Sequence, residues 1–182
     1  MEYGIKIEIH PTKEQEEYLS YCCKVYHNMR NWLVAKYKDC LPRVSKNGII
    51  GYRDIDIYKE YYIDDIPKRI YRSVLSNYGY SLNQFYHHVV SRPPKFHKYN
   101  PNKQSFCIVD RRFTVNKYKI SLPRYRGCTV SKYIHLDMSF IDKYNITEIF
   151  DVHYTKYKNK WYLSGFIKVK NARKDKKGIY RA

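Results

Sequence analysis

The hydrophobic pattern changes its period twice along the chain, and this order limits the folds that the chain can form. Tyr3, Ile5, Ile7 and Ile9 alternate with polar residues, which is the pattern of a half-buried β-strand. Apolar residues then recur every three or four positions, as in amphipathic helices, and alternation returns from about Gln104. The order of strand, helices and further strands predicts an α+β fold: a small β-barrel with an inserted helical subdomain.

The first helix has a clear start signal. Thr12 stands at the N-cap position and Gln15 follows three residues later, which forms a capping box. The pattern predicts a helix that continues to about Lys38, then a loop over residues 39–51. Its expected buried stripe consists of Leu19, Cys22, Tyr26, Met29, Leu33 and Tyr37.

Two more helices are expected before the chain returns to strands. A short one is predicted over residues 54–62, and a longer one starts at Pro67, which suits a first helical turn. The longer helix ends before Pro93 and Pro94, because consecutive prolines bar helix. Its expected buried stripe consists of Ile70, Val74, Tyr78, Leu82, Phe85 and Val89.

The second half of the chain predicts short strands joined by basic turns. Asn116 is expected to lie in a tight hairpin, and Tyr157-Lys158-Asn159 in another. Gly165 falls on the same face as Trp161. The expected strands cover residues 104–109, 112–115, 117–122, 129–136, 147–155 and 161–169.

The charge of the chain indicates a polyanionic partner. Lys and Arg number 35 and Asp and Glu 17, a net charge of +18, and the cations are interleaved with 22 tyrosines. Cations hold phosphates while tyrosine rings stack on bases, which favours RNA and single strands. A soluble basic protein with a solvated face is the alternative. No apolar run is long enough to cross a membrane, and no secretory signal is evident, so we expect an intracellular protein of the cytoplasm or nucleoid.

Cysteine and histidine do not indicate a metal centre. The five cysteines include no C-x-x-C pair, and the histidines form no H-E-x-x-H motif. We therefore expect neither a metal nor a cofactor, and reduced cysteines.

Five segments, in this order, resemble motifs of the TnpB family, also called OrfB, the transposon-associated RNA-guided nucleases related to type V CRISPR effectors. The resemblance extends over residues 3–169. The matching segments are residues 7–19 (IEIHPTKEQEEYL), 26–32 (YHNMRNW), 94–98 (PKFHK) with Ser105-Phe106, 122–124 (LPR) with Gly127, and 159–164 (NKWYLS).

The resemblance implies a division of the chain into domains. Residues 1–11 and 95–170 would form a wedge-like β-barrel and residues 12–94 a helical recognition insertion. Apart from the resemblance, the basic composition of residues 171–182 predicts a flexible tail. In the family the barrel and the insertion hold the guide RNA, read a short duplex motif beside the target and grip the guide–target heteroduplex. Guide RNA is therefore the expected partner, together with target-adjacent duplex DNA.

The resemblance also implies that catalysis is absent. Family members continue into a RuvC-like nuclease that begins with G-I-D, whereas this chain ends with Gly178-Ile179-Tyr180 and two further residues. Two-metal cleavage needs several carboxylates. We therefore expect a nuclease-lacking binding protein with no catalytic residue. The alternatives are a binding subunit whose RuvC-containing partner is a separate chain, a decayed transposon fragment, and a direct DNA-binding repressor.

The candidate nucleic-acid-binding residues lie in or beside the matched motifs and at basic turns. The cations are expected to contact phosphates, and the two tyrosines are available to stack. The set is Lys13, Arg30, Lys95, Lys98, Arg124, Tyr125, Arg126, Lys156, Tyr157, Lys158 and Lys160.

Overall fold

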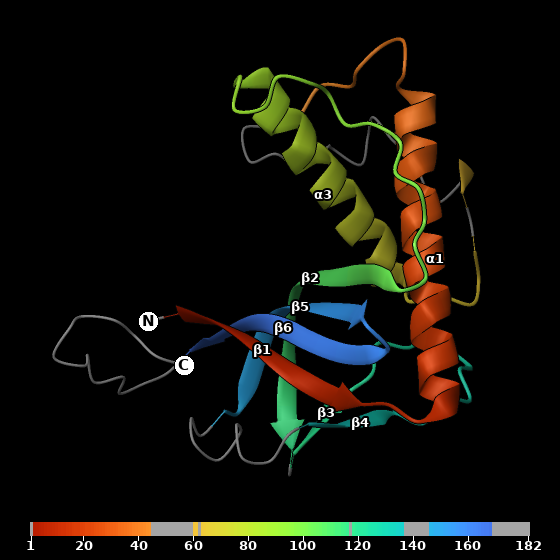
Figure 1. Cartoon of the computed structure of the whole chain (residues 1–182), viewed down its shortest axis with the longest axis vertical. Coiled ribbons are helices and arrows are strands. Elements are labelled where there is room, and N and C mark those ends of the chain that lie inside the picture. Colours follow the sequence, from red (N-terminus) through yellow and green to blue (C-terminus); the bar gives the residue numbers. More distant parts are fainter. Residues whose placement is uncertain (1, 45–59, 62, 117, 137–145, 169–182) are drawn as a thin grey trace, which may run out of the picture.

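The computed structural model describes residues 2–44, 60–61, 63–116, 118–136 and 146–168 (Figure 1). These residues form an antiparallel sheet and two helices, which confirms the predicted α+β class. The elements are β1 (Glu2–His10), α1 (Lys13–Lys36), α3 (Lys68–Tyr86), β2 (Lys103–Asn116), β3 (Lys119–Ser121), β4 (Tyr133–Leu136), β5 (Glu148–Tyr157) and β6 (Lys160–Lys168). The expected short helix at 54–62, apart from residues 60 and 61, and the tail at 171–182 lie outside the described residues.

The strands pair in the order β1-β4-β3-β2-β5-β6, and β6 pairs in turn with β1, so the pairings form a closed circuit. The circuit is uneven, because β1 and β4 share only two register pairs whereas β1 and β6 pair along nearly their whole length. Inward-facing side chains fill the interior and are almost fully buried: Ile5, Ile7, Ile9, Phe106, Ile108, Ile134, Ile149, Tyr154, Trp161 and Leu163.

Strand β2 differs from the prediction, which had two strands at 104–109 and 112–115. It is continuous, and its pairing with β5 shifts register between Ile108 and Arg112. Ile108 pairs with Val152 and Arg112 with Phe150, so β2 has extra residues that β5 does not match. A bulge of this kind bends the strand without ending it.

The turn between β5 and β6 is tighter than predicted. Tyr157 pairs with Lys160, which leaves Lys158 and Asn159 as the two turn residues. Both have positive φ, 48° and 62°, as a type I′ hairpin requires.

Helix α1 begins as the capping box predicts. Thr12 Oγ1 accepts from the Gln15 backbone N–H at 3.3 Å, and Gln15 Oε1 accepts from the Thr12 backbone N–H at 2.9 Å. Leu19, Cys22 and Met29 of the predicted stripe are fully buried. Tyr26 and Tyr37 are half-buried.

Helix α3 is shorter than predicted. Ile70, Val74, Tyr78 and Leu82 are buried as expected. The helix ends at Tyr86, so Val89 lies beyond it and is 66% exposed, and its assignment to the buried stripe was wrong. His88 has a φ of 56°, which is incompatible with continued helix.

The two helices lie together at one side of the sheet. In Figure 1 the first half of α1 flanks the sheet, and its second half extends beyond the sheet and packs beside α3. Both helices contact β2. At this junction the Cys107 thiol lies 3.4 Å from the Tyr26 hydroxyl and accepts from Asn77 Nδ2 at 3.0 Å. Burial raises the pKa of Cys107, so the thiol is neutral at pH 7.

The helices fall between β1 and β2 along the chain, but the division into a barrel and a separate helical subdomain stays a prediction. The described helices have no apolar stretch of the length that a membrane crossing requires.

Candidate nucleic-acid interface

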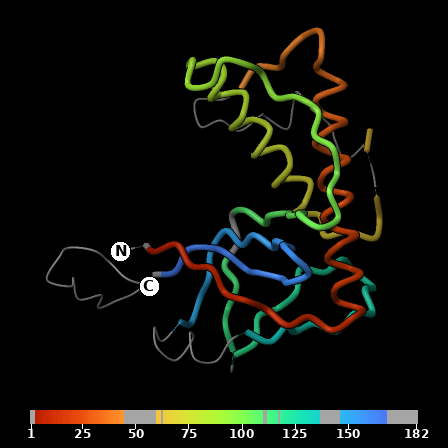
Figure 2. Tube along the Cα trace, viewed as in Figure 1, coloured from red at the N-terminus to blue at the C-terminus, as the bar shows by residue number. Residues whose placement is uncertain are grey.

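The segment between α3 and β2 runs along α1, as Figure 2 shows. We call residues 94–102 the strap. Arg30 Nη1 donates to the Lys95 carbonyl at 2.9 Å. The Asn31 side chain forms two hydrogen bonds with the backbone of His97. Its Nδ2 donates to the His97 carbonyl at 2.8 Å, and its Oδ1 accepts from the His97 N–H at 3.1 Å. The structure thus brings together two predicted sites, Arg30 and Lys95, that are 65 residues apart in the sequence.

Further contacts tie the strap to the start of β2. The rings of His27 and Tyr99 meet edge to face with centroids 5.4 Å apart. The Tyr99 hydroxyl donates to Gln104, and Gln104 Nε2 donates to Ser20 Oγ at 3.1 Å. The strap is therefore attached to α1 through its backbone at Lys95 and His97 and through the side chain of Tyr99.

The side chains of the strap face solvent while its backbone is held. Lys95, Phe96 and Lys98 are all exposed. Burial lowers the pKa of Arg30, but the ordinary value lies so far above 7 that the guanidinium stays charged. Burial and the charge of Arg30 also lower the pKa of His97, so His97 is neutral at pH 7. The strap is therefore a cationic surface at neutral pH.

The predicted cluster at the β5–β6 turn is also on the surface. Lys158 Nζ lies 5.4 Å from the centroid of the Tyr157 ring, and Tyr157 is 44% exposed. Lys160 forms an ion pair with Glu8 at 3.1 Å, and this contact raises the Lys160 pKa. Lys156 is half-buried and lies over Trp161, 5.8 Å from that ring's centroid.

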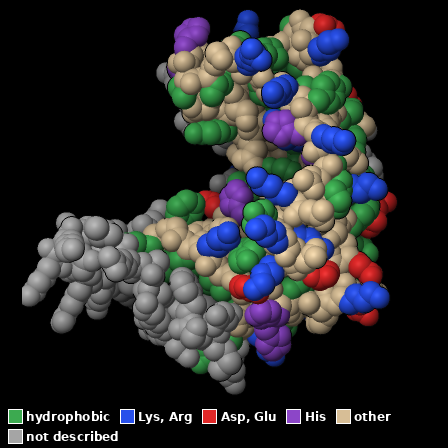
Figure 3. All heavy atoms as spheres, in the orientation of Figure 1, with side chains coloured by type: hydrophobic (Ala, Val, Ile, Leu, Met, Phe, Trp, Pro, Cys, Tyr) green, Lys and Arg blue, Asp and Glu red, His purple; other side chains and the backbone are tan. Residues whose placement is uncertain are grey.

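This turn is adjacent to the end of the strap. Lys103, the first residue of β2, pairs in register with Tyr157. The start of β2, which follows the strap, and the β5–β6 turn thus meet at one end of the sheet. In the view of Figure 3, Lys and Arg side chains extend from the helical part of the molecule down to the sheet, and several Asp and Glu side chains lie near the first turns of α1.

The remaining predicted residues lie on or near a loop packed on the first half of α1. Arg124 Nη1 donates to the carbonyls of Cys128 at 3.3 Å and Val130 at 3.0 Å, so this guanidinium braces its own loop. Tyr125 is half-buried, with its ring 6.3 Å from that of Tyr18. Lys13, at the start of α1, and Arg126 are exposed. Of this group, Lys13 and Arg126 are therefore the side chains best placed to reach a ligand.

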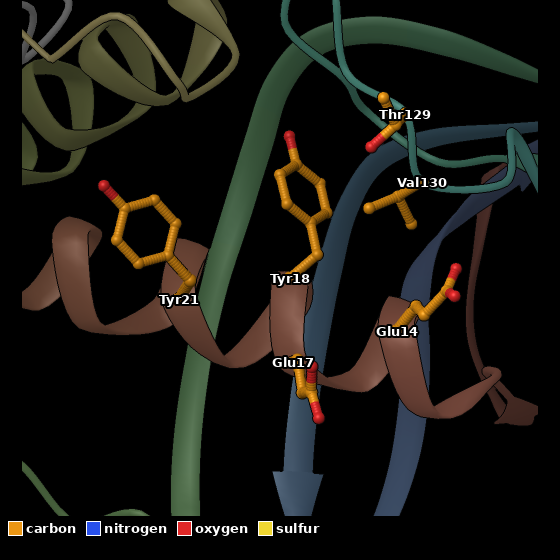
Figure 4. Close-up of a pocket in the computed structure, with 6 residues that line it drawn as sticks. All are labelled: Glu14, Glu17, Tyr18, Tyr21, Thr129 and Val130. Carbon is orange, nitrogen blue, oxygen red and sulfur yellow. The ribbon is translucent and has the colours of Figure 1, made fainter.

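An open depression of about 550 Å³ lies between part of this loop and α1 (Figure 4). Tyr18 points toward the Thr129 and Val130 segment, and Glu14 and Glu17 line the same depression. Two carboxylates repel phosphate, so the depression does not extend the cationic surface. Within the described ranges, no group of three or more His, Cys, Asp or Glu side chains is placed to hold a metal ion.

Sequence reasoning missed two residues of this surface. Asn31 clamps the strap, and Phe96 is its exposed aromatic side chain. Both lie inside the motifs quoted above, but the selection there considered mainly cations and tyrosines. His27 and Asn31 are four residues apart and therefore lie on the same face of α1. This pair of polar residues is the sequence pattern that could have indicated the face on which the strap lies.

No protein-family model matches the chain, and a search of the curated proteins finds no significant match.

Proposed function

We propose that this protein is a TnpB-like nucleic-acid-binding protein that binds a structured guide RNA and, through it, target-adjacent duplex DNA. The observation that carries the proposal is the strap. Its backbone is hydrogen-bonded to Arg30 and Asn31 of α1, so Lys95 and Lys98 are presented from a held segment. A lysine on a backbone that is already held loses less backbone entropy when it binds a phosphate.

The charge balance supports the same proposal. A net charge of +18 on 182 residues is a strong repulsion within a compact chain, and a polyanion relieves it. Each phosphate contact also releases condensed counterions, which favours binding and makes it salt-dependent.

The resemblance to TnpB suggests how the parts divide the work. We propose that the closed sheet is a wedge-like barrel and that α1 and α3, which lie between β1 and β2 in the chain, are its inserted recognition subdomain. In RNA-guided recognition the protein holds RNA by shape and charge, while base pairing reads the target sequence. A role as the binding subunit of a split nuclease uses the same surface and adds a RuvC-containing partner.

A direct DNA-binding repressor has less support. A helix-turn-helix motif joins its two helices by a turn of three or four residues. Helix α1 follows strand β1 directly, and residues 37–44 after it are turns and irregular backbone. The described residues directly before and after α1 therefore do not supply the partner helix that such a motif needs.

The test is the salt dependence of RNA affinity, measured with a structured RNA of known secondary structure. The double variant Lys95→Gln/Lys98→Gln should bind more weakly, and the slope of log K against log salt should fall by about 0.7 to 0.9 for each lost phosphate contact. Lys132→Gln removes one exposed charge from the loop beside the acidic depression and should leave the slope close to that of the wild type. Wild-type protein without salt-dependent RNA binding would contradict the proposal. A double variant with the wild-type slope would remove the strap from the interface.

A further inference from the structure

Phe96 is an aromatic side chain held out in solvent. It is 57% exposed and does not belong to the apolar cluster that fills the molecule. A tyrosine at the surface can keep its polar hydroxyl in water, but a phenylalanine has no polar group at the end of its ring. An exposed ring of this kind is available to a ligand that offers an apolar face.

The backbone on both sides of Phe96 is held. The carbonyl before it, of Lys95, accepts from Arg30, and the residue after it, His97, is bonded to Asn31 through both its N–H and its carbonyl. A phenylalanine on a held backbone has only two side-chain torsions left to fix when it binds. The segment thus presents the ring at a low entropic cost.

Cations flank Phe96 in the sequence. Lys95 precedes Phe96 directly, and Lys98 follows two residues later, so the two lysines lie within about 10 Å of each other along the chain. Sites for single-stranded nucleic acid combine these features, because cations hold successive phosphates while an aromatic ring stacks on a base. A base inside a duplex is already covered on both faces by its neighbours.

We propose that Phe96 stacks on an unpaired base of the bound RNA, with Lys95 and Lys98 on the flanking phosphates. The charge around the ring favours this occupant over an apolar protein surface, because a protein partner would have to bury or neutralise the two lysines. This inference rests on the proposed RNA-binding function and names the part of an RNA that the strap contacts.

The experiment compares affinities of the full chain for a single-stranded oligoribonucleotide and for a blunt RNA duplex of the same sequence. Phe96→Ala should weaken single-strand binding about tenfold, within the range measured for one stacked base, and should leave duplex binding unchanged. Phe96→Trp should retain the affinity, because it keeps a stacking face. Phe166→Ala is the matched control: Phe166 is a 47% exposed phenylalanine on β6, and its loss should not change either affinity.

Two further results separate this inference from the proposed function. Phe96→Ala should keep the wild-type salt slope, because the ring contacts no phosphate, whereas the double variant Lys95→Gln/Lys98→Gln should lower it. In an oligonucleotide that carries 5-iodouridine, ultraviolet light should crosslink the iodinated base to residue 96. Unchanged single-strand affinity in Phe96→Ala, with salt-dependent binding intact, overturns the stacking inference alone. Full affinity in Phe96→Leu also overturns it, because an aliphatic contact would then be sufficient.

Discussion

At Gly165 the neighbouring strand leaves no room for a side chain. Gly165 lies on β6, opposite the place where the β5 pairing shifts register between Phe150 and His153. A Cβ atom at this position would lie 2.6 Å from the Phe150 carbonyl oxygen and 2.7 Å from Cγ2 of Ile149. Backbone cannot move aside as a flexible side chain can, so the site accepts only glycine.

Gly165→Ala should therefore lower the free energy of unfolding by about 1 to 3 kcal/mol, the usual cost of overpacking. Gly4→Ala is the matched control, because Gly4 also lies in a strand and a Cβ there would meet no atom within 4 Å. That variant should stay within about 0.5 kcal/mol of the wild type. Urea unfolding of both variants measures the difference, and equal stabilities would contradict this account of the bulge.

Asn31 is the residue whose side chain holds the backbone of the strap at His97. Asn31→Ala removes both hydrogen bonds to the His97 backbone, and two such bonds contribute about 1 kcal/mol each. The His97 amide should then exchange with solvent hydrogen at least tenfold faster, and RNA affinity should fall because the strap must be ordered on binding. Asn28→Ala, at an exposed position on the same helix, should change neither quantity. An unchanged His97 exchange rate in Asn31→Ala would show that the strap is held by other contacts.

At the scale of elements, the start of α1 joins a helix to the sheet. Gln15 is almost fully buried, and it completes the capping box while its Nε2 donates to the carbonyls of Ser131 at 3.0 Å and Tyr133 at 2.9 Å. The capping box could be read from local sequence, because it depends on residues three apart. The contacts to residues 131 and 133 could not, because they depend on how the chain returns more than 100 residues later.

These two roles make opposite predictions for Gln15→Glu. Glutamate is as good as glutamine in a capping box, so the local rule predicts no loss. The structure predicts a loss of about 2 kcal/mol or more, because a buried carboxylate would face two carbonyl oxygens with no donor between them. The exposed Glu14→Gln should be nearly neutral.

The pH dependence identifies the cause of that loss. The carboxylate of the Gln15→Glu variant should have a pKa in the folded state above its ordinary value of about 4.3, because its surroundings disfavour the charge. The deficit in stability should therefore be complete at neutral pH and should shrink as the pH falls through the raised pKa. A deficit that is constant between pH 7 and pH 4 would indicate a steric cause.

The elements that sequence reasoning placed well are those with a regular period. The strand at β1, the helix stripes of α1 and α3 and the β5–β6 hairpin follow from spacing alone. The errors occur where geometry departs from the period. Strand β2 continues through a bulge at Ile108 to Arg112 that interrupts its alternation, and Val89 continues the helical spacing after the backbone has left the helix.

The candidate site shows the same division. The cations were found because they lie in short motifs, and the structure brings Arg30 and Lys95 together. The clamp by Asn31 and the exposure of Phe96 depend on the course of the strap along α1, which no local pattern contains. The role of Arg124 as a brace for its own loop likewise depends on the loop conformation.

At the scale of the whole molecule, the strap leads into β2 where Lys103 pairs with Tyr157, so it ends beside the turn that carries Lys158 and Lys160. The acidic depression has a different lining and lies between the first half of α1 and its loop. The molecule thus has one surface suited to a polyanion and another that repels it. The central claim is that the first surface binds a structured RNA.

The most direct test is to recover the full chain from the cells that naturally produce it and to sequence the RNA that accompanies it. The account predicts one strongly enriched structured RNA with the wild-type chain, and loss of that enrichment with the charge-reversed variant Lys95→Glu/Lys98→Glu. Lys132→Glu, which changes one charge outside the strap, should retain the RNA. No enriched RNA with the wild-type chain, or equal enrichment with the strap variant, would contradict the claim.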